Sequence, residues 1–371
     1  MRSLMIAMAA ALLAASSEAS AQQRAFGMTP DGTEASLYTI TGAGGMVARI
    51  SDYGATLTEL WVPDRTGALG DVVLGFDSLR PYLETTYYLG ATMGRVANRI
   101  ANARFTLDGH GYVLAANRPP HHLHGGVRGF DKRLWRARVL GDSSVAFTYT
   151  SPNGEEGYPG TVRVTITYTL TPRNALRVDF AATTNRATPI NLTNHTFFNL
   201  GDAGTATILD HVLTLRASRY TAVDASLIPT GVIAPVAGTP LDFTRPRRIG
   251  DRIDELRAVA NGYDHNFVLD GAPRTGALAL AARVEEPRSG RVLEIHTTEP
   301  GMQLFTGNRF DGALTGAGGR VLVRHAGIAL ETQHFPDSIN HPEFPSVVLR
   351  PGKPFRSTTI YGFSTTDASA R

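Results

Sequence analysis

Residues 162–171 carry the strongest constraint on the fold. Apolar side chains occupy the even positions, and arginine or threonine occupies the odd ones without exception (VRVTITYTLT). A strict period of two predicts an antiparallel β-strand with one buried face and one face toward solvent. Residues 172–174 (PRN) then favour a turn, and residues 176–181 predict the returning strand of a hairpin.

Strand signals continue along the rest of the chain. Residues 105–107 and 112–114 flank Asp108-Gly109, a pair typical of tight hairpin turns. Helical signals are few: we expect a short helix at 78–84, which contains a proline, and a second short helix at 251–259. This pattern predicts an all-β fold, a large antiparallel β-sandwich.

The first residues are typical of a signal peptide. Arg2 provides the positive charge, residues 4–15 form a short apolar stretch, and residues 19–21 (ASA) form a small-residue cleavage site. The apolar stretch is too short to span a membrane. We therefore expect cleavage after Ala21, a periplasmic or secreted protein, and a single domain over residues 22–371. N-terminal sequencing of the mature protein checks this prediction.

Composition excludes several functional classes. The chain has no cysteine, which rules out disulfides, thiolate catalysis and cysteine-ligated metals. The net charge is only +3, and the arginines are scattered among acidic residues, apart from residues 245–248 (RPRR). We therefore expect no nucleic-acid partner, and no membrane association after signal cleavage.

Two segments hold candidate proton-transfer groups. Residues 191–201 (NLTNHTFFNLG) surround His195 with asparagine and threonine side chains. Glu331 follows the apolar run 327–330, and a carboxyl at the end of an apolar strand is partly desolvated, which suits it to act as a base. The pair predicts acid–base chemistry on a hydroxylated ligand.

Other polar residues are candidates for ligand binding. Asn98 and Arg99 lie between apolar residues in GRVANRIA, where a bend would present them to a cleft. Asp264 precedes an apolar strand, so it either caps a turn or accepts hydrogen bonds from hydroxyl groups. Gln303 and Phe305 share one face of a predicted strand, and an amide beside an aromatic ring suits sugar recognition.

The segment HHLHGG raises the question of a metal site. His121, His122 and His124 are close in sequence, but no HExxH motif or companion carboxylate accompanies them. The Gly125-Gly126 pair favours a tight loop that exposes His124. We expect no metal.

In combination, these segments resemble the aldose 1-epimerase (galactose mutarotase) family. The matching motifs are GRVANRI, HLHGG, NLTNHTFFNLG, DHNFVL, GMQLFTGN and ETQHFPDSINHPEFPSVVLRPG, in the order of the family. The resemblance implies a galactose mutarotase-like supersandwich that needs no cofactor. It also implies a general base at Glu331, a general acid at His195, and substrate-binding roles for Arg99, His124, Asp264 and Gln303, to which we add Asn98.

The predicted activity is interconversion of the α and β anomers of a free aldohexose such as glucose or galactose. It needs an ionised Glu331 and a protonated His195, and we expect the neighbouring carboxylate to raise the pKa of His195. Two alternatives stay open: a sugar-binding module without chemistry, and a glycoside hydrolase or lyase on a related sandwich. A hydrolase needs a second carboxylate, for which Asp264 is the candidate. The expected partner is a monosaccharide, and the protein is either a monomer or a homodimer.

Overall fold

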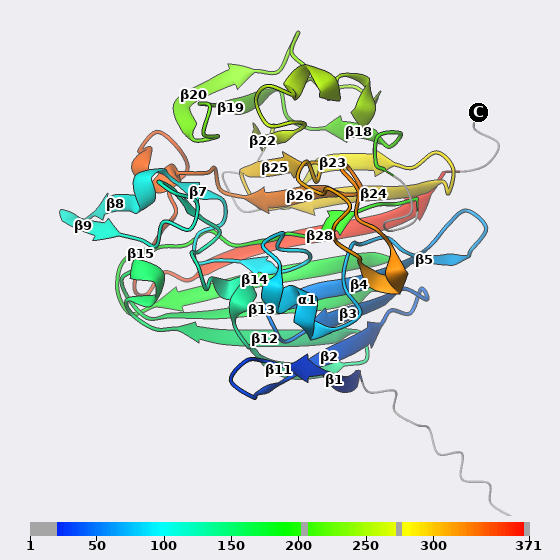
Figure 1. The fold of residues 1–371 in the computed structure, drawn as a ribbon, viewed down its shortest axis with the longest axis horizontal. Helices are drawn as coiled ribbons and strands as arrows, with labels where there is room; N and C mark the ends of the chain where they lie inside the picture. Colours follow the sequence, from blue (N-terminus) through cyan, green and yellow to red (C-terminus); the bar gives the residue numbers. More distant parts are fainter. Residues whose placement is uncertain (1–20, 202–206, 272–276, 367–371) are drawn as a thin grey trace, which may run out of the picture.

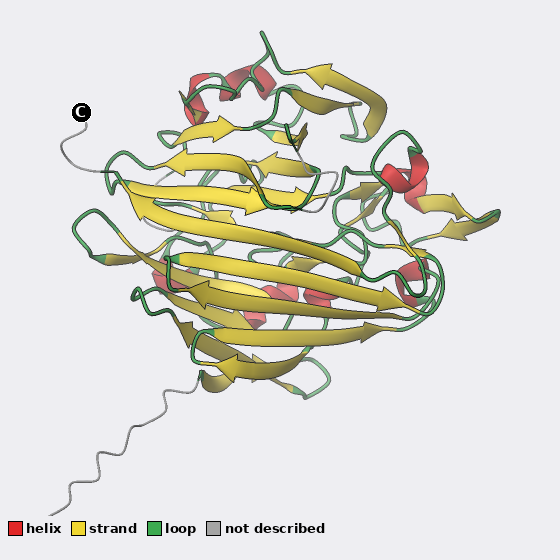
Figure 2. Cartoon of the chain, turned by 180° about the vertical axis from the view of Figure 1, so that it is seen from behind, coloured by secondary structure: helices red, strands yellow, loops and turns green. Residues whose placement is uncertain are grey.

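A sheet of nine antiparallel strands, counted over residues 21–201, 207–271 and 277–366 that the structure describes, forms one face of the protein. In this computed structural model its long central strands run across the whole width of the molecule (Figure 2). Its strands, in spatial order, are β11 (Arg136–Gly141), β12 (Ser144–Ser151), β13 (Val162–Thr171), β14 (Ala175–Thr184), β28 (Phe355–Thr365), β24 (Arg291–Thr297), β23 (Ala279–Glu285), β18 (Val212–Leu215) and β21 (Arg247–Arg248).

Both predicted hairpins are confirmed. The even residues of β13 are buried and its odd residues are half-buried or exposed. The strand pairs with β14 from Thr171↔Ala175 onward, so the turn falls on residues 172–174. In the second hairpin, β8 (Arg104–Leu107) pairs with β9 (His110–Val113). Its turn residues Asp108 and Gly109 have φ values of 50° and 78°, the left-handed conformation that a type I′ turn requires.

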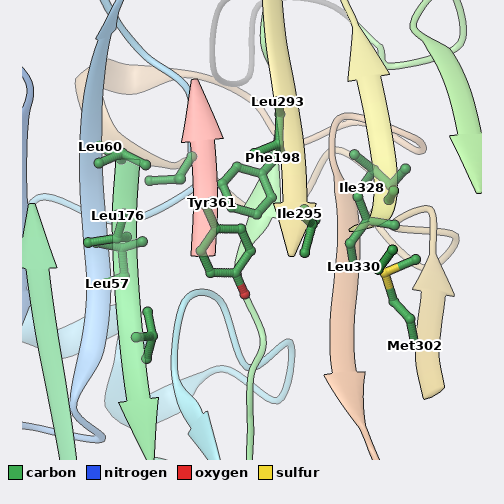
Figure 3. Close-up of a cluster of buried hydrophobic side chains, with 14 of the residues drawn as sticks. Leu57, Leu60, Leu176, Phe198, Leu293, Ile295, Met302, Ile328, Leu330 and Tyr361 are labelled. Atoms are coloured by element: carbon green, nitrogen blue, oxygen red, sulfur yellow. The ribbon is translucent and has the colours of Figure 1, made fainter. Parts of the chain in front are cut away.

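Two further antiparallel sheets lie on the other side of the core (Figure 1). Leu57 of one sheet, Leu330 of the other and Leu176 of β14 meet in the same apolar cluster (Figure 3). Each fully buried side chain of this size contributes ~1.5–3 kcal/mol to folding. One sheet contains β1 (Gln22–Met28), β2 (Glu34–Thr41), β3 (Val47–Ser51), β4 (Thr56–Pro63) and β5 (Leu69–Asp71), and the other contains β17 (Phe197–Phe198), β26 (Ile328–Gln333), β25 (Gly301–Phe305), β22 (Asp264–Val268), β19 (Arg219–Val223) and β20 (Pro229–Pro235).

The alternation of side chains in β22, β25 and β26 separates the core from a polar face. On β26, Leu330 points into the core, so its neighbour Glu331 points to the opposite face. On β25, Met302 likewise points into the core and its neighbour Gln303 points to the opposite face. Gln303 is directly opposite Glu331 on one neighbouring strand and Asn266 on the other. Strand register therefore gathers polar groups from distant segments on one face.

Short elements connect these sheets. The helix expected at 78–84 is confirmed as α1 (Leu79–Glu84). At 251–259 the structure instead has the 3₁₀ turns η4 (Ile249–Asp251) and η5 (Ile253–Leu256), and left-handed φ angles at Asn261 and Gly262 end the segment. The remaining elements are β6 (Thr92–Met93), β7 (Arg99–Ile100), β10 (His122–Leu123), β15 (Thr188–Pro189), β16 (Thr193–Asn194), β27 (Val348–Leu349), η1 (Ala101–Ala103), η2 (Phe130–Lys132), η3 (Glu155–Gly157), η6 (Ala317–Gly319) and η7 (Ser338–Asn340).

Two predictions about the ends and the organisation of the chain remain predictions. Residues 1–20 of the expected signal peptide lie outside the described residues. Strand β1 begins at Gln22, the first residue after the expected cleavage site. Export and the single domain over residues 22–371 are therefore still expectations. Across the described part of the chain, no helix has the length and apolar character needed to cross a membrane.

Candidate active site

A cavity of about 210 Å³ lies against the polar face of β22, β25 and β26. Six of the seven predicted site residues line it, and Gln303 does not. The cavity is lined by Asn98, Arg99, His124, His195, Asp264 and Glu331, together with Thr86, Tyr87, Tyr88, Arg118, Leu123, Phe305 and Arg309.

Asp264 is held in place from two sides. Gln303 donates a hydrogen bond from Nε2 to Asp264 Oδ1 at 2.6 Å. The guanidinium of Arg99 lies 3.3 Å from Asp264 Oδ2 and is itself held by Asn98 Oδ1 at 3.2 Å. In this structure Gln303 therefore orients the carboxylate that lines the cavity. Its own Oε1 is buried and has no hydrogen-bond partner among the described residues.

Two adjoining loops place His124. The backbone N–H of His124 donates to the carbonyl of Asn98 at 3.0 Å, and the N–H of Asn98 donates back to His124 Nδ1 at 3.1 Å. Because Nδ1 accepts a hydrogen bond, the proton of the neutral ring lies on Nε2, which makes His124 a donor toward a ligand. The next residue must be glycine: at Gly125 (φ 87°) a Cβ atom would lie 1.7 Å from the carbonyl oxygen of Gly94.

The three histidines of HHLHGG do not meet. His122 lies within hydrogen-bonding distance of the carbonyl of Ala115 and the hydroxyl of Tyr158, both at 2.7 Å. His121 accepts a hydrogen bond from the N–H of Asn102 at 3.1 Å. Only His124 lines the cavity. The three histidines that suggested a metal site in the sequence therefore lie apart in the structure.

A different group has the spacing of a metal site. Ligand atoms of His124, His195 and Glu331 all lie within 4.8 Å of one another, and all three residues are buried. Two imidazoles and a carboxylate are donors that first-row transition metals accept. The sequence did not reveal this group, because its members come from three separate segments. That the protein uses no metal stays a prediction.

His195 and Glu331 form a buried pair at the base of the cavity. His195 Nε2 lies 3.5 Å from Glu331 Oε1, and the two residues are only 3% and 2% exposed. Burial lowers the pKa of His195 to about 4. Burial, followed by the charge of Asp264, raises the pKa of Glu331 well above its usual range, while Arg99 opposes the shift. These shifts favour the protonated carboxyl of Glu331 and the neutral imidazole of His195, so the favoured state of the pair holds one proton, on the carboxyl group.

The expectation that Glu331 would raise the pKa of His195 is wrong in the ligand-free protein. Loss of solvation outweighs the attraction of the carboxylate of Asp264, because the side chain of His195 is almost fully removed from water. The neutral imidazole and the neutral carboxyl are the favoured forms. The ion pair is reached by moving one proton from Glu331 to His195, without a proton from solvent.

Sequence reasoning missed several residues that line the cavity. The ring of Tyr88 lies 4.7 Å from that of His124 and 5.8 Å from that of His195, measured between centroids. Arg118 and Arg309 lie in loops far apart in the chain, where no periodic pattern marks them. Phe305, which was expected to share a face with Gln303, does line the cavity.

A large antiparallel sandwich with a polar cavity on one sheet face defines the class of galactose mutarotase-like proteins. The chain superimposes on the GalM/aldose epimerase homologue of Caenorhabditis elegans with a TM-score of 0.83 and 32% identity, covering 90% of this chain and all of that one. The corresponding values for galactose 1-epimerase of Lactobacillus acidophilus are 0.81 and 27%, with 94% and 100% covered.

Sequence comparison gives the same assignment. The aldose 1-epimerase family model matches residues 36–362. Human galactose mutarotase is 49% identical over 315 residues, which cover 85% of this chain and 90% of that protein. Aldose 1-epimerase of Escherichia coli K12 is 36% identical over 340 residues, covering 91% and 97%. The chain belongs to the aldose 1-epimerase family.

The resemblance seen in the sequence is therefore confirmed, and so are the all-β supersandwich and the assignment to the isomerases. The protein interconverts anomers of an aldose. Neither a sugar-binding module without chemistry nor a glycoside hydrolase or lyase is favoured by these relationships.

Proposed function

We propose that Glu331 and His195 catalyse the anomerisation of a free monosaccharide such as D-galactose or D-glucose. The observation that carries this proposal is the buried pair itself, with His195 Nε2 and Glu331 Oε1 3.5 Å apart at the base of the cavity. A carboxyl and an imidazole this close to a bound hemiacetal supply both proton-transfer groups that ring opening requires.

The reaction needs two proton transfers. Glu331 takes the proton from the hydroxyl on C1, and His195 gives a proton to the ring oxygen. The bond between C1 and the ring oxygen breaks, and C1 becomes a planar aldehyde. Rotation about C1–C2 exposes either face, and the two transfers reverse as the ring closes. Atoms and charge balance without an outside reagent.

Neighbouring side chains position the sugar. Asp264 offers a carboxylate whose orientation is fixed by Gln303 and Arg99. His124 offers an N–H group, since its Nδ1 already accepts a hydrogen bond. Acceptors and donors in fixed positions suit sugar hydroxyls, which both give and receive hydrogen bonds. Phe305 adds an apolar ring to the wall.

The direct test is polarimetry on freshly dissolved α-D-galactose and α-D-glucose. We expect the protein to speed the approach to the equilibrium rotation without changing the final value, because a catalyst alters only the rate. Protein denatured by heat is the control. No acceleration of either sugar, or of any other free aldose, would contradict the proposed function.

The pH dependence follows from the single proton on the pair. Below the pKa of His195, about 4, the pair gains a second proton and no base remains. Above the raised pKa of Glu331 the last proton is lost and no acid remains. We expect a bell-shaped rate profile whose acidic limb reports His195 and whose alkaline limb reports Glu331, as apparent values of a coupled pair.

The profile is measured by following kcat and kcat/KM from pH 3.5 to 10 in buffers of constant ionic strength. The position of the acidic limb is the informative quantity. A limb near pH 6.5, the ordinary value for histidine, would show that burial does not depress the pKa of His195. Recovery of full activity on return to pH 7 excludes unfolding as the cause of the limb.

A further inference from the structure

Two arginines stand at the mouth of the cavity. Arg118 lies in the loop between β9 and β10, and Arg309 lies in the loop that follows β25. Both line the cavity, and both are exposed, whereas Glu331 and His195 lie buried at its base. The two exposed arginines therefore lie on the side of the cavity that faces solvent, which we call its entrance.

The backbone holds both arginines in place. Arg118 exchanges two backbone hydrogen bonds with His121, at 3.0 and 2.7 Å. The carbonyl of Arg309 accepts a hydrogen bond from the hydroxyl of Tyr87 at 2.8 Å. The preceding residue, Asn308, donates to the carbonyls of Ala260 and Tyr263 at 2.9 Å each. Both charges are therefore presented from loops of fixed geometry.

Neither of these guanidinium groups has a carboxylate in direct contact within the part of the chain that the structure describes. Arg99 has the carboxylate of Asp264 at 3.3 Å, but within the described ranges neither Arg118 nor Arg309 has an ion pair or a side-chain hydrogen bond. Arg309 is exposed as a whole residue, but its guanidinium is partly shielded from water, which lowers its pKa; the positive charge of Arg118 lowers it further, and the charge of Asp264 opposes the shift. Two like charges thus face the same space, an arrangement that is unfavourable until an anion joins them.

Elsewhere in the cavity, the carboxylate of Asp264 is paired with Arg99. Burial raises the pKa of Glu331 and lowers the pKa values of His124 and His195, so burial favours the uncharged form of each of the three groups. The charge of Asp264 also favours the charged form of Arg309, but by less than the charge of Arg118 disfavours it. The field at the entrance is therefore set by Arg118 and Arg309, and it attracts negative charge.

We propose that the cavity prefers aldoses that carry an anionic group, either the carboxylate of a hexuronic acid or the phosphate of a sugar phosphate. Arg118 and Arg309 bind this group at the entrance while the hemiacetal lies against Glu331 and His195. Arginine suits the task, because its planar fork donates two parallel hydrogen bonds to a carboxylate or a phosphate. This inference rests on the proposed function and names its substrate class.

The test compares three sugars in a buffer without phosphate: D-galactose, D-galacturonate and D-galactose 6-phosphate. Anomerisation is followed by polarimetry and by NMR exchange between the anomeric signals. With the wild-type protein at low salt, we expect kcat/KM for at least one anionic sugar to exceed that for galactose by about tenfold or more. The ratio of kcat/KM for the anionic sugar to that for galactose should decrease as salt is added, because ions screen exposed charges. Comparison of galacturonate with galactose 6-phosphate shows whether the cavity prefers a carboxylate or a phosphate.

The variant R118Q/R309Q removes both charges and keeps hydrogen-bonding groups of similar size. We expect the ratio of kcat/KM for the anionic sugar to that for galactose to fall at least about tenfold, mainly through KM. The matched control, R163Q/R356Q, removes two exposed arginines of β13 and β28 that do not line the cavity. Its ratio should equal that of the wild type.

The outcomes separate the two proposals. If the wild type accelerates galactose but neither anionic sugar is faster, the preference for anions is wrong and the proposed function stands. The preference is also wrong if R118Q/R309Q keeps the wild-type ratio. If none of the three sugars is accelerated, the proposed function fails and the inference fails with it. Because the wild-type comparison needs no variant, a poorly folded variant does not prevent the test.

Discussion

Replacement of Glu331 by glutamine is expected to lower kcat by at least ~10²-fold, or ~2.7 kcal/mol of barrier. The amide keeps the shape of the side chain but cannot accept a proton from the hydroxyl on C1. Sugar binding should be retained, because Asp264, Arg99 and His124 are unchanged. The measurement is polarimetry for kcat together with calorimetric titration of the sugar. A Glu331→Gln protein with wild-type turnover would remove Glu331 as the base.

Stability gives this prediction a control. Burial raises the pKa of Glu331, so its neutral form is favoured in the fold, and a neutral amide should not lower the unfolding temperature. Glu299 is the matched residue: it is also buried beside a histidine, with Oε2 2.6 Å from His334 Nδ1, but it does not line the cavity. Glu299→Gln should lower the unfolding temperature and leave the kcat of the folded protein near the wild-type value.

Replacement of His195 by asparagine is expected to reduce kcat to a similar extent, ~10²-fold. The asparagine amide can donate a hydrogen bond to the ring oxygen but cannot transfer a proton to it. The acidic limb of the rate profile, which we assign to His195 with a pKa of about 4, should disappear or move. The measurement is the full pH profile of the variant rather than the rate at one pH.

His211 provides the comparison. It is buried, burial lowers its pKa to about 4 as well, and its Nε2 accepts a hydrogen bond from the N–H of Leu200 outside the cavity. His211→Asn should therefore leave the acidic limb of the folded protein unchanged. A His195→Asn protein that kept the wild-type rate and limb would make His195 a binding or core residue. The acid would then have to be sought at His124.

Local sequence predicts the strands of this fold well, but it does not predict which strands lie next to one another in a sheet. The alternation of residues 162–171 identifies β13 and its hairpin, because the period of side chains is a local property. Nothing local specifies that Gln303 lies between Asn266 and Glu331, since that register depends on pairing between distant segments. The order of the motifs along the chain was enough to predict the site residues. Their contacts could be seen only in the structure, because they depend on how the strands pair in the sheet.

Charge states were the least predictable property. A carboxylate near His195 favours imidazolium in water, but the actual shift depends on how completely both groups lose solvent. Likewise, no sequence pattern indicates that Arg118 and Arg309 face one cavity, because loop geometry brings them together. The separation of His122 from His124 has the same origin, since the left-handed φ of His124 (50°) turns the chain there.

The division of β22, β25 and β26 into two faces has a consequence for protein engineering. Leu330 and Met302 anchor these strands in the interior, while Glu331 and Gln303 occupy the positions beside them on the opposite face. A designer can therefore change the polar face one alternate residue at a time and leave the apolar core residues of the same strands untouched. Libraries aimed at new sugars can be restricted to alternate positions of this kind, with Glu331 kept as the base, so that most of their members keep the core on which folding depends.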